Sequence, residues 1–260
     1  MSQAIIETNN LSIHFSGLAA LDDFNFSLYP GELVGLIGPN GAGKTTAFNL
    51  LTGVYEATAG TYRLNGKEVK KTRPHKLVKE GLARTFQNIR LFGYLSVLDN
   101  VLIAKNDQMT YGPIAGALRL PKYWQEEAKA KAEAMELLKL FDLDSMAHYR
   151  ANTLPYGSQR KLEIVRALAT KPKVLLLDEP AAGMNPNETA SLMETIKMVR
   201  DKFNITILLI EHDMKLVLGI CERLIVLNQG KTIAQGKPLE VVNNPDVIRA
   251  YLGDEGFVEA

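Results

Sequence analysis

The alternation of apolar and polar residues predicts two kinds of β-strand in this 260-residue chain. Apolar positions alternate with polar ones within residues 4–30 and again at 61–66, which is the period of strands with one buried face, and we expect them to pair antiparallel. The later runs Val174–Leu177 and Ile207–Ile210 are apolar throughout, as strands buried on both faces must be. We therefore expect a half-exposed antiparallel sheet and a second, buried sheet.

The middle of the chain has a helical pattern. Residues 97–105 and 126–141 are predicted helices, joined by a Gly- and Pro-containing connection at 106–123 that is expected to be irregular and partly exposed. One face of the second helix is predicted to carry four apolar side chains: Ala128, Ala132, Met135 and Leu138. We interpret residues 88–153 as a helical insertion into the main domain.

Helices and strands alternate in the last third. Predicted helices over Ser158–Thr170 and Glu188–Lys202 each lead to an apolar strand, the second over Ile205–Ile210. This order is typical of a parallel sheet covered by helices. Two short segments, Leu224–Leu227 and Thr232–Gln235, flank an Asn-Gln-Gly-Lys turn and predict a hairpin.

Composition narrows the class of protein. Apolar residues make up 46% of the chain and charged residues 23%, which is ordinary for a globular protein. The formal net charge of +1 provides no global field toward nucleic acid or anionic lipid. The single cysteine, Cys221, excludes an internal disulfide and is expected to be a small apolar filler. No apolar run approaches the ~20 residues of a membrane-spanning helix, and no signal peptide is predicted.

One short segment carries the strongest chemical signal. It has the pattern Gly, four residues, Gly-Lys-Ser/Thr of a phosphate-binding loop and consists of Gly38, Pro39, Asn40, Gly41, Ala42, Gly43, Lys44, Thr45 and Thr46. A buried strand precedes it and a helix follows, which disfavours the alternative of an ordinary Gly-rich turn. Glycines let backbone N–H groups and the helix dipole point at phosphate oxygens. Lys44 is expected to bind the β- and γ-phosphates, and Thr45 to ligate Mg²⁺.

Polar side chains follow two of the predicted buried strands. Asp178 and Glu179 come after Val174–Leu177, and His212 comes after Ile207–Ile210. Ligands gather at the carboxyl ends of parallel strands. We expect Asp178 to serve the Mg²⁺ site, Glu179 to act as the general base for the attacking water, and His212 to hold that water and the γ-phosphate.

Gln87 is a weaker candidate. It stands where the sheet gives way to the helical insertion, in Arg84-Thr85-Phe86-Gln87. A neutral amide can contact Mg²⁺ or water and then withdraw without leaving a buried charge. Taken alone, the residue would be interpreted as an ordinary polar surface residue.

Together these motifs resemble the ATP-binding subunits of ABC transporters over essentially the full chain. Within that family the chain looks most similar to the ATPases of bacterial branched-chain amino acid importers. The general resemblance also rests on Leu154–Arg160, and the segments that carry the closer one are Leu154–Gly157, Leu162–Leu168, Asp178–Asn185, Ile210–Met214 and Asn244–Gly253. The long connection near 106–123 is similar to one of the two ATPases of such importers.

The resemblance implies an α/β fold. Its core would be a P-loop NTPase (RecA-like) domain with a mostly parallel sheet, an N-terminal antiparallel β subdomain and an inserted α-helical subdomain. The expected division is 1–87 with 154–260 for the nucleotide-binding core, and 88–153 for a helical subdomain that contacts membrane subunits.

It also implies a head-to-tail dimer, in which each nucleotide lies between the 38–46 loop of one protomer and the signature segment of the other. In this sequence the signature residues expected to contact nucleotide are Tyr156, Gly157 and Ser158. A helix beginning there would offer backbone N–H groups to the γ-phosphate, so we interpret Arg160 as a surface residue rather than a ligand. Phe15 stands at the place of an adenine-stacking aromatic, with a core aromatic as the equal alternative.

Two residues depart from the family pattern. Pro155 replaces the usual signature serine and lacks an N–H group, and Asn185 stands where an aspartate is frequent in the dimer-crossing loop. Both bear on how well this protomer's signature supports hydrolysis in its partner's site.

The resemblance implies ATP and Mg²⁺ as cofactors, and hydrolysis coupled to branched-chain amino acid uptake. The implied partners are a second ATPase (a related but distinct chain or another copy), two membrane-spanning permease subunits and an extracytoplasmic substrate-binding protein, without nucleic acid. The chain would lie peripherally on the cytoplasmic face of the inner membrane. The alternatives are the ATPase of another short-chain ABC transporter, including an exporter, a soluble ABC-type ATPase acting on nucleic acid, and a small-molecule kinase.

Overall fold

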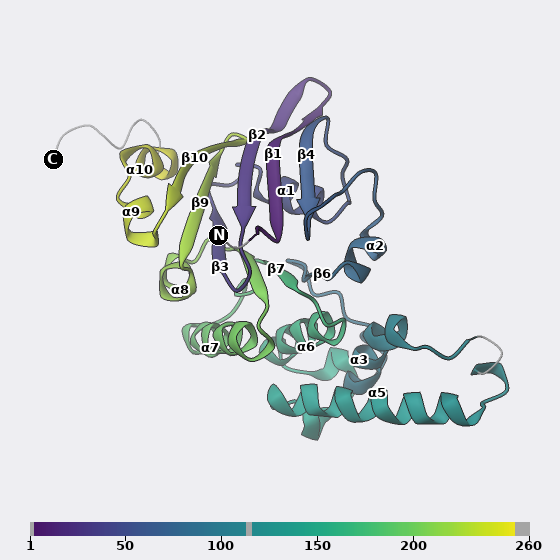
Figure 1. Ribbon diagram of the computed structural model, residues 1–260. Coiled ribbons are helices and arrows are strands. Elements are labelled where there is room, and N and C mark those ends of the chain that lie inside the picture. The colour runs from purple at the N-terminus through teal and green to yellow at the C-terminus, as the bar shows by residue number, and fades with distance from the viewer. Residues whose placement is uncertain (1–2, 113–115, 253–260) are drawn as a thin grey trace. The chain divides into compact units, whose positions relative to one another are not determined.

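The computed structural model describes residues 3–112 and 116–252, which form two compact units (Figure 1). The first unit comprises Met1–Arg84 and Lys173–Ala260, and the second comprises Thr85–Pro172. The predicted boundary at 153/154 differs from this division, because residues 154–172 group with the helical insertion rather than with the core. No helix in the described part of the chain is long and apolar enough to span a bilayer.

The first unit contains the predicted antiparallel sheet. Its order is β2 (Leu18–Leu28), β1 (Ile6–Phe15), β4 (Ala59–Leu64) and β5 (Lys67–Glu68). β1 is a ten-residue strand. The register shifts between Thr8 and Leu11, where Asn10 adopts a left-handed conformation with φ 51°. This irregularity is a β-bulge, which explains why the alternation is interrupted there.

The second sheet of this unit is six-stranded and mostly parallel, as predicted. In order it contains β10 (Lys231–Gly236), β9 (Arg223–Asn228), β3 (Leu33–Ile37), β8 (Thr206–Ile210), β7 (Val174–Asp178) and β6 (Leu82–Arg84). Every residue of the central strands β3, β7 and β8 is buried, as their unbroken apolar runs require. The expected hairpin is confirmed, because β9 and β10 pair antiparallel.

Helices complete the first unit. They are α1 (Lys44–Leu51), α2 (Pro74–Lys79), α7 (Pro186–Phe203), α8 (Met214–Ile220), α9 (Pro238–Val242) and α10 (Pro245–Leu252). One hydrophobic cluster joins Phe24 of the antiparallel sheet, Phe48 of α1, and Val34 and Leu208 of the parallel sheet. Because α1 packs into this shared core, the position of its first residues is fixed by both sheets.

The second unit is helical. It contains α3 (Val97–Lys105), α5 (Pro121–Leu140) and α6 (Tyr156–Ala169), with 3₁₀ turns at Asn106–Gln108, Asp144–Met146 and Ala151–Thr153. The predicted connection 106–123 thus ends inside the first turn of α5, and its residues 113–115 lie outside the described part. The three long helices pack against one another, which is why α6 groups with this unit.

The predicted apolar face of α5 is wrong at two of its four positions, since Leu138 is buried and Met135 is half-buried. Its buried residues are Ala130, Ala134 and Leu138, whereas Ala128 and Ala132 are exposed. Two alanine rows run along this helix at a spacing of four residues, and both are compatible with an apolar face. Packing against α3 and α6 selects the row that continues into Leu138.

Candidate functional site

The phosphate loop connects β3 to α1 and requires glycine at two positions. Gly38 has φ 147°, and a Cβ atom there would lie 2.1 Å from the Leu227 carbonyl oxygen. Gly43 has φ 103°, and its Cβ would lie 2.7 Å from the Ala20 carbonyl oxygen. α1 starts at Lys44 without a side-chain cap, so its N-terminal N–H groups are not covered by a capping residue. This geometry suits an anion at the helix N-terminus.

Lys44 lies folded back into this loop. Its Nζ donates hydrogen bonds to the carbonyl oxygens of Gly38, at 2.7 Å, and Pro39, at 2.9 Å. Burial lowers the pKa of Lys44, and the charges of Glu179 and Asp178 oppose that shift. The loop carbonyls hold the ammonium group where phosphate oxygens would attract it more strongly.

Asp178 ends β7 and is paired with a residue that the sequence reasoning missed. Its Oδ2 accepts a hydrogen bond from Nη2 of Arg84 at 2.6 Å. Arg84 ends the three-residue strand β6, which pairs in parallel with β7. A strand this short has no recognisable period, and the only signal was a cation three residues before Gln87.

Glu179 and His212 lie together at the ends of neighbouring strands. Glu179 is a non-glycine residue with φ 45°, and its N–H donates to the Ile210 carbonyl at 2.9 Å. His212 Nδ1 is 3.8 Å from Glu179 Oε2, and 64% of the histidine side chain is exposed. A left-handed backbone at a charged residue is a form of strain that accumulates at functional sites. The arrangement places a carboxylate and an imidazole where both can reach one water molecule.

Glu211 supports these two residues and was also not assigned from sequence. Its buried carboxylate accepts hydrogen bonds from the N–H groups of Ala181, at 2.7 Å, and His212, at 3.1 Å. Burial raises the pKa of Glu211, and these backbone hydrogen bonds oppose the increase. The carboxylate therefore ties the turn after Glu179 to the turn that carries His212.

In the second unit, the prediction that Arg160 is a surface residue is wrong. Arg160 is 2% exposed and donates to the carbonyl oxygens of Phe86, at 2.8 Å, and Gln87. It also contacts Tyr156 Oη at 3.0 Å and Glu163 Oε2 at 3.2 Å. The helical periodicity of the sequence around Arg160 does not reveal that the loop at Phe86 and Gln87 places its carbonyl oxygens beside this side chain. Arg160 thus fixes the backbone at Gln87, whose own side chain is exposed, to the start of α6.

The expected signature contacts occupy the first turn of α6. Pro155 is the N-cap residue, and no side chain caps this helix. Tyr156 is exposed, and Gly157 and Ser158 are half-buried. Because this turn belongs to the second unit and the phosphate loop to the first, the two halves of the predicted nucleotide site are carried by different units.

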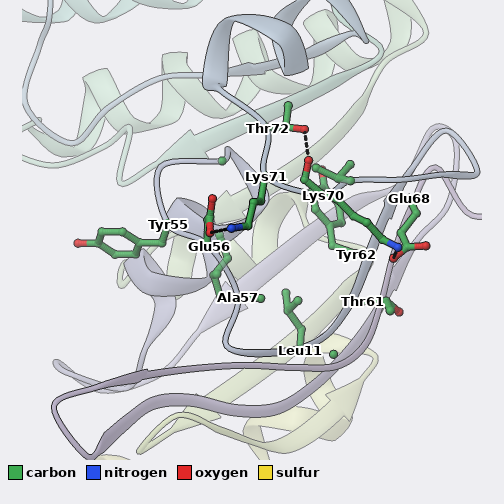
Figure 2. Close-up of a pocket in the computed structure, with 14 residues that line it drawn as sticks. Leu11, Tyr55, Glu56, Ala57, Thr61, Tyr62, Glu68, Lys70, Lys71 and Thr72 are labelled. Atoms are coloured by element: carbon green, nitrogen blue, oxygen red, sulfur yellow. Dashed lines mark hydrogen bonds and ion pairs between the residues drawn. The ribbon is translucent and has the colours of Figure 1, made fainter.

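Phe15 ends β1 and is 42% exposed, which contradicts the alternative of a core aromatic. Its ring packs edge-on against Tyr55, with centroids 5.2 Å apart. Tyr55 in turn lines a pocket of about 360 Å³ that is bordered by residues between Leu11 and Thr72 (Figure 2). The lining of this pocket does not include the phosphate loop.

The oxygen donors present fit magnesium. Thr45, in the first turn of α1, and Asp178 offer a hydroxyl and a carboxylate, the hard ligands that Mg²⁺ prefers beside nucleotide phosphates and water. In the described residues no group of three or more His, Cys, Asp or Glu side chains could hold a metal by itself. A site with one hydroxyl and one carboxylate leaves further coordination positions for nucleotide phosphates and water.

Comparison with known proteins identifies the class. Residues 21–182 match the family described as "ABC transporter", and residues 231–256 match one described as "Branched-chain amino acid ATP-binding cassette transporter". The chain belongs to the ABC transporter family of ATP-binding proteins. The predicted family and ATPase class are thereby confirmed.

The relatives are similar over almost their whole length. The chain is 47% identical to the high-affinity branched-chain amino acid transport ATP-binding protein LivG of Escherichia coli K12, and 44% identical to BraF of Pseudomonas aeruginosa, which has the same description. Each match covers 98% of this chain and 100% of the relative. The crystal structure of the ADP conformation of MJ1267, an ATP-binding cassette of an ABC transporter, matches with a TM-score of 0.84 and 30% identity over 97% of this chain and 100% of that one. The predicted fold class is confirmed.

Proposed function

We propose that this protein hydrolyses ATP to drive the uptake of branched-chain amino acids through separate membrane-spanning subunits. The observation that carries the proposal is the 47% identity to LivG over 98% of the chain, since that relative is named for this transport. The C-terminal match at 231–256, to a family named for branched-chain amino acids, supports the same substrate class.

The site residues have distinct roles in this proposal. The 38–46 loop and Lys44 bind the triphosphate, and Thr45, Gln87 and Asp178 would hold Mg²⁺. When bound, the metal offsets phosphate charge. Glu179 accepts the proton of the attacking water, and His212 orients that water against the γ-phosphate. Phe15 stacks on adenine, for which its exposed ring is available.

The nucleotide is enclosed by two protomers. Tyr156, Gly157 and Ser158 of one protomer face the phosphate loop of the other, and the uncapped start of α6 offers N–H groups to the γ-phosphate. ATP then closes the dimer because it binds the closed state more tightly than the open one. Hydrolysis reopens it, and helices around residues 88–105, within the helical subdomain 88–153 that contacts the membrane subunits, pass the motion to them.

The assembly contains two permease subunits, a second ATPase that is a related but distinct chain or another copy, and an extracytoplasmic binding protein. This chain binds at the cytoplasmic face of the inner membrane as a peripheral subunit. Nucleic acid is not a partner.

Reconstitution tests the proposed direction and substrate. The complex captured through this subunit is identified, placed in lipid vesicles with ATP on the cytoplasmic side, and supplied with radiolabelled leucine, isoleucine or valine. We expect ATP-dependent import of these amino acids, and no import with the variant Glu179→Gln. Recovery of exporter membrane subunits, or vesicles that import none of the three, would contradict the proposal.

A further inference from the structure

The pair Arg84–Asp178 is a buried ion pair beside the proposed metal site. The Arg84 side chain is 7% exposed and that of Asp178 is 5% exposed, with 2.6 Å between Nη2 and Oδ2. A carboxylate this deeply buried needs a compensating cation or hydrogen bonds even when no metal is present. Arg84 therefore compensates the buried charge of Asp178 and is not a solvent-screened surface charge.

The same guanidinium group also contacts α1. Arg84 Nη1 donates to Asn49 Oδ1 at 2.7 Å and to Thr52 Oγ1 at 3.2 Å. Its central carbon lies 5.5 Å from the ring centre of Phe48. Phe48 and Asn49 belong to α1, and Thr52 is its C-cap residue. Arg84 thus links the last turn of this helix to the end of β7.

The two linked elements each supply one proposed metal ligand. Thr45 lies in the first turn of α1, and Asp178 is the last residue of β7. A planar guanidinium group donates from both Nη atoms in a fixed geometry, so a contact to each element restrains the separation and orientation of both. A lysine ammonium, which is a point charge on a flexible stem, could compensate the Asp178 charge but could not impose this geometry.

We propose that Arg84 is a positioning residue for magnesium: it holds the Asp178 carboxylate at the separation from Thr45 that Mg²⁺ bound to nucleotide requires. The proposal rests on the proposed Mg²⁺ site at Thr45 and Asp178. Arg84 itself does not contact the metal. It acts as outer partners of metal ligands do, by orienting a ligand that would otherwise sample several positions.

The test measures metal dependence of nucleotide binding rather than turnover. A fluorescent ATP analogue is bound to the purified full-length chain in EDTA and then in a Mg²⁺ titration. For Arg84→Met we expect the half-saturating Mg²⁺ concentration to rise about tenfold, the lower end for loss of such a partner, and for Arg84→Lys about threefold. Binding in EDTA is expected to stay close to that of wild type, because the phosphate loop is unchanged.

Two control variants make the result specific. Arg63→Met removes an exposed arginine of the same unit, which lies 3.8 Å from Glu7, and should leave the titration unchanged. Asn49→Ala removes one anchor of Arg84 and leaves its pairing with Asp178 intact, so a smaller increase in the same direction is expected. This variant, with Arg84→Lys, decides the question if Arg84→Met does not fold.

Asp178→Asn distinguishes a failure of the proposed Mg²⁺ site from a failure of the role proposed for Arg84. If this variant keeps the wild-type Mg²⁺ dependence, the proposed metal site itself is wrong. If Asp178→Asn loses the dependence while the Arg84 and Asn49 variants titrate like wild type, Arg84 is only a structural partner and the inference is overturned. Tighter Mg²⁺ binding in Arg84→Met would also overturn it, because Arg84 would then compete with the metal instead of positioning its ligand.

Discussion

Glu179 combines a reactive carboxylate with an unfavourable backbone conformation. Its φ of 45° costs about 1–3 kcal/mol for a non-glycine residue, and a hydrogen bond from its N–H to Ile210 helps to hold it. The turn that results places the side chain 3.8 Å from His212. Strain at this position is consistent with selection for the direction of one side chain over local stability.

Substitution Glu179→Gln tests the role of this carboxylate. The amide keeps the shape of the side chain but cannot accept the proton of the attacking water, so we expect turnover to fall by about 10²–10⁴-fold. Binding of ATP should remain, and the nucleotide-bound variant should accumulate as a closed dimer in size-exclusion chromatography. Single-turnover hydrolysis at the wild-type rate would remove Glu179 from the role of general base.

Glu211 is expected to make stability depend on pH. Burial raises the pKa of Glu211 above its ordinary value of 4.5. As the pH rises, Glu211 therefore ionises first in the unfolded state, and the free energy of unfolding falls until Glu211 also ionises in the folded state. Glu211→Gln should therefore show a smaller decrease in unfolding free energy than wild type as the pH rises above 4.5. Urea unfolding across this range measures both slopes, and parallel curves would contradict the assignment.

At the scale of elements, α7 shows how a departure from the family pattern is accommodated. Asn185 is the N-cap of this helix and accepts hydrogen bonds from the N–H groups of Asn187 and Glu188, each at 3.0 Å. Glu188 Oε2 in turn accepts from the Asn185 N–H at 2.9 Å, which completes a capping box. Asparagine and aspartate are comparable N-caps, so the helix start does not require the family's aspartate.

From this capping box we expect two substitutions of Asn185 to differ in their effect on the free energy of unfolding. Asn185→Ala removes the acceptor for two N–H groups and should lower the free energy of unfolding by about 1 kcal/mol, whereas Asn185→Asp should change it by only a few tenths. Chemical denaturation of the two variants measures the difference. Equal losses in both would mean that another feature of the side chain stabilises this turn.

The elements also show where sequence patterns are sufficient. β3, β7 and β8 could be predicted because strands buried on both faces must be apolar throughout, and the phosphate loop because few residues can replace its glycines. β6 and Arg84 could not be predicted, since three residues have no period and an ion pair depends on parallel strand pairing. The predictions for the buried row of α5 and for Arg160 were wrong for the same reason. In both cases, burial is decided by segments that are close in space but distant in sequence.

At the scale of the whole molecule, the chemistry is divided between two units. The phosphate loop, Asp178, Glu179 and His212 lie in the first unit, and Gln87 and the signature turn at 156–158 lie in the second. The residues of the two groups alternate along the sequence. The motifs could therefore be recognised from the sequence, but the spatial arrangement of their residues could not.

The direct test of the proposal that two protomers enclose the nucleotide is the ATPase rate per protomer, measured over a hundredfold range of protein concentration together with the oligomeric state by analytical ultracentrifugation. We expect negligible turnover wherever the chain is monomeric, and any rate that appears with dimerisation should be abolished by Gly157→Glu. Full turnover by a monomeric preparation, independent of concentration and unaffected by Gly157→Glu, would contradict it.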